Sequence, residues 1–154
     1  PAASQIVRIA LRNRQDFPVE QTYRLFVKEI PSEKPLEEGG VRVALQMNIP
    51  VHIVPSKVEK KPLEFKYLKL PDGSLALSAH NPGNVYVKAV EVKIIDTATG
   101  LPLESAPPVI QVLSGATKIF PLAAAGASTL PGKKLKIQAI GEGLLIDQTV
   151  SFEN

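Results

Sequence analysis

The sequence predicts an all-β fold, and three observations carry this prediction. The 154-residue chain contains 14 prolines and 10 glycines, which interrupt it too often for a long helix to form. The segments between them are rich in Val, Ile, Leu and Tyr, and apolar residues alternate with polar ones as in half-buried strands. Turn signals such as Asp72-Gly73 separate consecutive segments. Short strands at this spacing favour a sandwich of two sheets.

The first part of the chain is expected to form three strands. These strands cover residues 5–12 (QIVRIALR), 21–30 (QTYRLFVKEI) and 41–55 (VRVALQMNIPVHIVP), with a polar loop over 31–40. So few strands cannot cover their own apolar faces, because a sandwich buries one sheet against another. Residues 1–54 are therefore expected to be an incomplete domain.

The third of these strands carries a row of apolar side chains. Val41, Val43, Leu45 and Met47 fall on one face of an extended chain, because side chains alternate between the two faces of a strand. This row has two interpretations. It is either part of the protein's own core or a surface intended for another polypeptide.

A change in composition predicts a domain boundary after this strand. The segment 56–62 (SKVEKKP) is short, charged and closed by proline, as linkers often are. We therefore expect the C-terminal part of a first domain over 1–55, a linker over 56–62 and a second domain over 63–154. Strands of the second domain are expected over residues 63–70, 74–81, 85–95, 108–114, 117–122, 134–141 and 144–152. The stretch 121–129 is expected to be a loop with a helical turn.

Composition and charge argue against several classes of function. The net charge of +3 comes from 18 basic and 15 acidic residues spread along the chain, which gives no basic run for nucleic acid. The absence of cysteine excludes disulfides, thiolate metal sites and a cysteine nucleophile. No apolar stretch reaches the roughly 18 residues of a membrane helix, so no membrane insertion is expected.

The side chains that commonly carry catalysis are also poorly placed. His52 and His80 lie in different expected domains, and neither has a second ligand at metal-binding spacing. Glu37 and Glu38 are adjacent in a loop, which does not hold two carboxylates at a fixed separation. We expect no enzyme activity, no cofactor and no metal.

Four stretches resemble a known family. They are VRIALRN (7–13), FPVEQTYRLFVKEIP (17–31), GGVRVALQMNIPVHIVP (39–55) and LALSAHNPGNVYVKAVEVKIID (75–96). Together they are similar to periplasmic pilus-assembly chaperones of the PapD type, which serve the chaperone–usher pathway. The ending IPVHIVP looks more like the divergent, archaic branch of that family.

The resemblance implies a fold and a function. Such chaperones have two immunoglobulin-like domains, so this chain would begin within the first and contain the whole second domain. They are periplasmic and bind pilus subunits, which they deliver to an outer-membrane usher. The last strand of the first domain complements a subunit that lacks a strand of its own. Carried over to this sequence, the subunit-binding row is Val41, Val43, Leu45 and Met47.

The anchor for the subunit's C-terminal carboxylate departs from the family pattern. Pro50 stands where well-known members have a lysine, and we offer Arg24 on the neighbouring strand as its replacement. The alternative for Arg24 is a solvated charge on a strand.

Two further expectations follow. A structural or adhesive immunoglobulin-like module, which uses the row only for its own core, is the alternative function. Open strand edges recruit other strands, so a second copy of the chain is expected to pair through residues 5–54.

Overall fold

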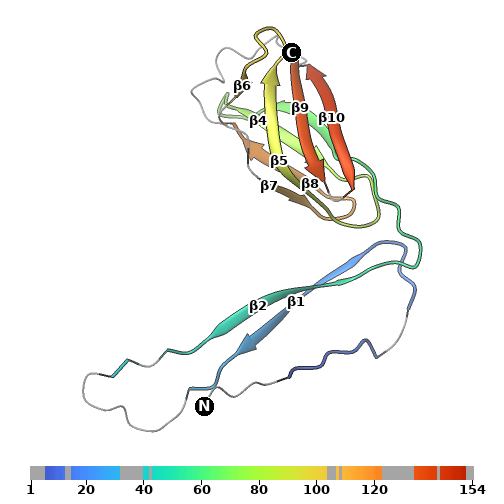
Figure 1. The fold of residues 1–154 in the computed structure, drawn as a ribbon, viewed down its shortest axis with the longest axis vertical. Helices are drawn as coiled ribbons and strands as arrows, with labels where there is room; N and C mark the ends of the chain where they lie inside the picture. Colours follow the sequence, from blue (N-terminus) through green and yellow to red (C-terminus); the bar gives the residue numbers. More distant parts are fainter. Residues whose placement is uncertain are drawn as a thin grey trace.

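The computed structural model describes residues 6–12, 15–31, 40–41, 43–103, 107, 109–122, 134–141 and 143–151. Within these ranges the chain forms strands and turns and contains no helix, which confirms the all-β prediction. The strands form a separate hairpin and a sandwich of two sheets, joined at one end of the hairpin (Figure 1).

The hairpin consists of β1 (Gln21–Lys28) and β2 (Gln46–Ile53), which pair antiparallel. The register runs from Gln21 opposite Ile53 to Lys28 opposite Gln46 without interruption. These strands form a sheet of only two strands, so most of their side chains remain exposed. The hairpin extends away from the sandwich (Figure 1).

The sandwich is immunoglobulin-like and contains the remaining strands. They are β3 (Glu64–Lys69), β4 (Leu75–His80), β5 (Val87–Asp96), β6 (Pro102–Leu103), β7 (Val109–Val112), β8 (Thr117–Pro121), β9 (Lys134–Gly141) and β10 (Leu144–Ser151). One sheet has the order β3-β4-β8. The other has the order β10-β9-β5-β6, with β7 also paired to β5.

The core lies between these two sheets. Alternation along each strand sends one set of side chains inward, as in β9, where Leu135, Ile137 and Ala139 are buried. They meet Phe65 and Leu77 from the opposite sheet in one continuous apolar cluster. This burial stabilises the sandwich independently of the hairpin, whose residues are absent from the cluster.

The turns follow the chemistry of their sequences. At the β3–β4 turn, Asp72 Oδ1 accepts hydrogen bonds from the backbone N–H and the hydroxyl of Ser74, at 2.9 and 2.6 Å. Gly73 has a φ of 83°, a conformation that glycine adopts without steric cost. At the β9–β10 turn, Gly143 has a φ of 77°. The turn predicted at Asp72-Gly73 is therefore present.

Some expected elements differ from the structure. The strand predicted over 5–12 is wrong for residues 6–12, which are exposed and pair with no strand. Alternation supplies a face for packing, but a strand also needs a neighbour for its backbone groups. The third strand was predicted over 41–55, but the observed strand β2 begins only at Gln46. Residues 43–45 are described and are not part of it. The short strand β6 was not predicted, and the stretch 121–129 lies outside the described residues beyond Leu122.

Candidate functional site

The apolar row of the third predicted strand is exposed. The exposed fractions are 85% for Val41, 80% for Val43, 56% for Leu45 and 41% for Met47. The row therefore lies outside the core of the sandwich. Large apolar side chains arranged in a line on a surface are typical of a binding site for another protein.

The hydrogen-bonding pattern of the hairpin defines its two faces and its two edges. The N–H of Glu29 donates to the carbonyl of Leu45 at 2.8 Å, which continues the β1–β2 register by one pair. Hydrogen-bonded pairs alternate with non-hydrogen-bonded ones in an antiparallel ladder. The odd-numbered residues of both strands therefore direct their backbone groups inward. The even-numbered residues direct theirs to the open edges.

The row shares its face with apolar side chains of β1. Met47 lies opposite Val27, and Ile49 lies opposite Leu25, so these side chains project from the same side of the hairpin. Val27 and Leu25 are half-buried, whereas Met47 and Ile49 are each 41% exposed. This face is a continuous apolar strip.

Arg24 lies on the other face of the hairpin. Its cross-strand partner is Pro50, and both are even-numbered members of a non-hydrogen-bonded pair. Arg24 is exposed and shares its face with Phe26, which is 61% exposed. The structure therefore does not bring Arg24 together with the row, although it places Arg24 directly across from Pro50.

A buried carboxylate joins the base of the hairpin to the sandwich. The side chain of Glu20 is 2% exposed, and its Oε1 lies 2.7 Å from Nδ1 of His52 on β2. Its Oε2 accepts a weaker hydrogen bond from the backbone N–H of Tyr86 at 3.4 Å. The ring of His52 stacks on that of Tyr86 with centroids 4.6 Å apart. These contacts connect both strands of the hairpin to the segment that leads into β5.

Asn84 makes a second set of connections at the same junction. Its side-chain amide donates to the carbonyls of Pro18 and Lys57, at 3.2 and 2.7 Å. Its Oδ1 accepts from the N–H of Glu59 at 2.7 Å, and its backbone carbonyl accepts from the N–H of Glu20 at 2.8 Å. One side chain thus links the segment before β1, the linker and the sandwich, which fixes their relative positions.

The linker also contacts the segment before β1. Ser56 donates to the Asp16 carboxylate through its backbone N–H and its hydroxyl, at 3.1 and 2.7 Å. These hydrogen bonds lower the pKa of Asp16, because they stabilise the charged carboxylate. Lys57 and Glu59 form an exposed ion pair at 2.8 Å.

Sequence reasoning missed the residues of this junction. Glu20 and Asn84 are polar residues next to apolar strands, which is a common pattern, and their contacts join residues far apart in the chain. Burial distinguishes Glu20 from the other glutamates near strands, and the sequence alone does not reveal that burial. Asn84 falls between the strands expected over 74–81 and 85–95, but its role at the junction was not predicted.

The remaining polar groups show no catalytic arrangement among the described residues. His80 lies 3.1 Å from the Thr117 hydroxyl and far from the hairpin along the chain. No group of three potential metal ligands occurs in the described ranges. The Tyr67 hydroxyl is buried and finds no partner in the described part of the chain, and burial raises its pKa.

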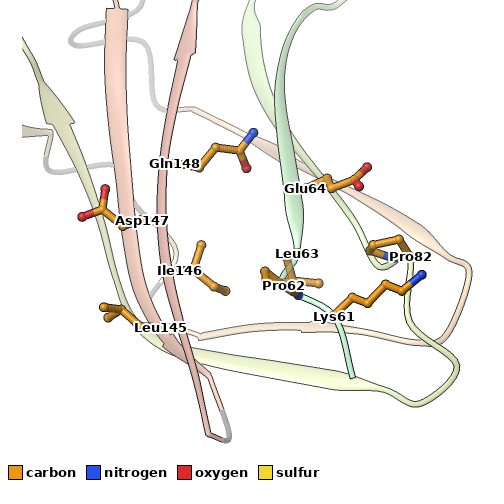
Figure 2. Close-up of a pocket in the computed structure, with 9 residues that line it drawn as sticks. All are labelled: Lys61, Pro62, Leu63, Glu64, Pro82, Leu145, Ile146, Asp147 and Gln148. Atoms are coloured by element: carbon orange, nitrogen blue, oxygen red, sulfur yellow. The ribbon is translucent and has the colours of Figure 1, made fainter. Parts of the chain in front are cut away.

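A pocket of about 400 Å³ lies where β3 and β10 face each other (Figure 2). Leu63 and Ile146 form part of its apolar lining, with Glu64 and Gln148 beside them. Gln148 accepts from the N–H of Phe65 at 2.9 Å and donates to its carbonyl at 3.1 Å. The side-chain amide of Gln148 thereby bonds to the backbone of β3 and connects the two sheets at this edge. The pocket lies between the same two edge strands.

A protein-family model matches the part of the chain that contains the hairpin. Residues 1–59 match the family model of the PapD N-terminal domain, described as a pili and flagellar-assembly chaperone. This match supports a family of the pilus-chaperone type.

The matched range includes both hairpin strands and the whole apolar row. Chaperones of this family are periplasmic and non-enzymatic, and they bind pilus subunits and an usher. No curated protein and no solved structure matches the chain significantly. The described residues contain no helix long and apolar enough to cross a membrane.

Proposed function

We propose that this protein is a periplasmic chaperone that stabilises pilus subunits by donor-strand complementation and delivers them to an outer-membrane usher. One observation carries the proposal. Val41, Val43 and Leu45 are exposed next to or on an edge strand, within the range that matches the chaperone family model. An edge strand offers unpaired backbone groups, and its side chains provide the apolar complement.

The spacing of the row suits a subunit that lacks a strand. Alternate side chains on a strand repeat every ~6.8 Å, so each enters a successive position along a groove. Burial of an exposed Val or Leu side chain contributes about 1.5–3 kcal/mol. A row of such side chains therefore supplies several kcal/mol, and backbone pairing sets the register.

Arg24 is the proposed anchor for the subunit's C-terminal carboxylate. The guanidinium forms bidentate hydrogen bonds with carboxylates, and its position opposite Pro50 lies three residue pairs past Met47, the last member of the row. The carboxylate would reach it across the edge at Pro50, because Arg24 projects from the face opposite the row.

The domain organisation belongs to the same proposal. Residues 1–55 belong to a first immunoglobulin-like domain, 56–62 form the linker and 63–154 form the second domain. We also propose that the chain belongs to the archaic branch of the pilus-chaperone family. The alternative function, a structural or adhesive module, would require the row to become covered by the protein's own chain.

We also propose that a second copy pairs with this chain through the open edge of β1. The backbone groups of Thr22, Arg24, Phe26 and Lys28 face that edge, and no proline interrupts them. An antiparallel pairing of two β1 strands with Leu25 opposite Leu25 of the second copy places Arg24 beside Phe26 of the second copy. This arrangement favours a cation–π contact.

Other registers of this pairing are less favourable. A shift by one residue pair in either direction sets Arg24 opposite a second Arg24 or opposite Lys28. Like charges directly opposite each other destabilise a sheet. The charges of β1 therefore select the register centred on Leu25.

Co-expression with pilus subunits tests the proposed function. A tagged chain should retain a subunit, and Leu45→Asp should abolish retention because the charge cannot enter an apolar groove. Leu145→Asp is the matched control, since Leu145 is also an exposed strand leucine but lies on β10. Equal retention by Leu45→Asp and the wild-type chain would contradict donor-strand binding.

A further inference from the structure

Pro50 interrupts the open edge of β2. It occupies an even-numbered, non-hydrogen-bonded position opposite Arg24, so its nitrogen faces away from β1. Proline has no N–H, and its nitrogen therefore leaves a gap among the donors along that edge. The ladder with β1 is continuous past this residue, because the gap lies on the other side of the strand.

The even-numbered residues on either side of Pro50 differ in their surroundings at the open edge of β2. Gln46 and Asn48 direct their backbone groups to the same open edge and are exposed. His52, beyond the proline, is held by Glu20 and stacked on Tyr86 at the junction with the sandwich. A strand approaching β2 thus finds the backbone donors of Gln46 and Asn48 before Pro50, and beyond it a residue whose side chain is held at the junction with the sandwich.

We propose that Pro50 sets the end of the segment on which β2 pairs with a pilus subunit. The incoming partner is an extended strand of the subunit, because a row of unpaired N–H and C=O groups is complementary to another extended backbone. Pairing uses the backbone of Gln46 and Asn48, while Met47 and the apolar residues before it face the groove. Pro50 therefore determines which subunit register is accepted. This inference rests on the proposed function.

Proline substitution at the edge tests the proposal, because it removes one donor without disturbing the ladder with β1. Asn48→Pro should lower retention of the co-expressed subunit by roughly 3- to 10-fold, the value of one lost hydrogen bond. Asn48→Ala keeps the N–H and should retain the subunit within about 2-fold of the wild-type chain. Circular dichroism of each free variant checks that the fold is intact.

Hydrogen exchange of the complex gives a second readout. The amides of Gln46 and Asn48 should become protected when the subunit binds, and that of His52 should not change. New protection of His52, equal losses for Asn48→Pro and Asn48→Ala, or no loss for Asn48→Pro would each overturn the assignment of Pro50. Failure of the wild-type chain to retain any subunit would instead contradict the proposed function, and the assignment of Pro50 would fall with it.

Discussion

Glu20 and His52 meet at 2.7 Å where the hairpin joins the sandwich, and the carboxylate of this pair is buried. A buried hydrogen-bonded group costs about 1–3 kcal/mol when its partner is removed and it is left unsatisfied. The pair therefore holds the hairpin against Tyr86. This contact lets an isolated two-stranded sheet, which is marginally stable alone, keep a defined orientation.

Loss of the Glu20 carboxylate should loosen the hairpin and leave the sandwich intact. In Glu20→Ala, amides of β1 and β2 should exchange roughly 10-fold faster, since about 1.4 kcal/mol of local stability corresponds to that factor. Exchange in β4 and β9 should stay unchanged. Glu64→Ala, which removes an exposed carboxylate on β3, serves as the control. Faster exchange throughout the sandwich would contradict a local role.

A methyl group at Gly83 should push the linker away from the sandwich. A Cβ at this position would lie 2.7 Å from the carbonyl oxygen of Glu59 and 3.1 Å from the N of Lys61, and both are backbone atoms. Overpacking of this kind costs about 1–3 kcal/mol, so Gly83→Ala should lower the free energy of unfolding measured in urea by that amount.

Gly73→Ala is the comparison for this substitution. Apart from Gly73 itself and its two neighbours in the chain, no atom lies within 4 Å of the position that a methyl group would take there, so its cost comes from the positive φ, about 1–2 kcal/mol. The two variants should differ in how the linker responds. Exchange at the amides of Glu59 and Lys61 should rise in Gly83→Ala and stay unchanged in Gly73→Ala, and the same response in both would contradict the proposed steric cause.

Self-association through β1 should be visible as a disulfide. The chain has no cysteine, so Leu25→Cys introduces a single thiol. In the proposed register the two copies of residue 25 form a non-hydrogen-bonded pair with Cα atoms about 4.5 Å apart, a separation that a disulfide spans. Oxidation should yield a covalent dimer on a non-reducing gel. Val27→Cys should not, because Val27 faces Tyr23 of the second copy, and equal cross-linking of both variants would contradict the register.

The contact between Asp16 and Ser56 should weaken in acid. The pKa of Asp16 is lowered by its hydrogen bonds to Ser56, so the folded state binds the proton less tightly than the unfolded chain. The contact is therefore fully present above the usual Asp pKa of about 3.9 and is lost as the pH falls through the lower, folded value. An NMR titration of the Ser56 amide should show a midpoint below about 3.9. A midpoint at or above that pH would contradict the hydrogen bonds.

The strands of the sandwich were largely predictable because each carries its own signal. Alternation placed β4, β5 and β9 within a residue or two of their observed bounds, and Asp72-Gly73 located a turn. The segment 6–12 shows the same alternation and is not a strand, since pairing depends on a neighbour that alternation does not specify.

The candidate site was predictable only in part. The row from Val41 to Met47 is visible in the sequence because apolar residues recur at every second position. Its exposure is not, because it depends on which other segments pack against it. The position of Arg24 on the opposite face follows from the register between two strands, and the sequence of either strand alone does not specify it. The contact between Glu20 and His52 depends on that same register and on the fold of the sandwich.

Thiol labelling at Leu45 shows whether a bound subunit covers the exposed row. In Leu45→Cys the single thiol should react rapidly with a maleimide in the free chain, because this position is 56% exposed. With a co-expressed pilus subunit bound, labelling should slow by at least about 10-fold, while Leu145→Cys on β10 should react at the same rate in both states. An unchanged labelling rate for Leu45→Cys, in a complex that retains the subunit, would contradict binding of the subunit through the row.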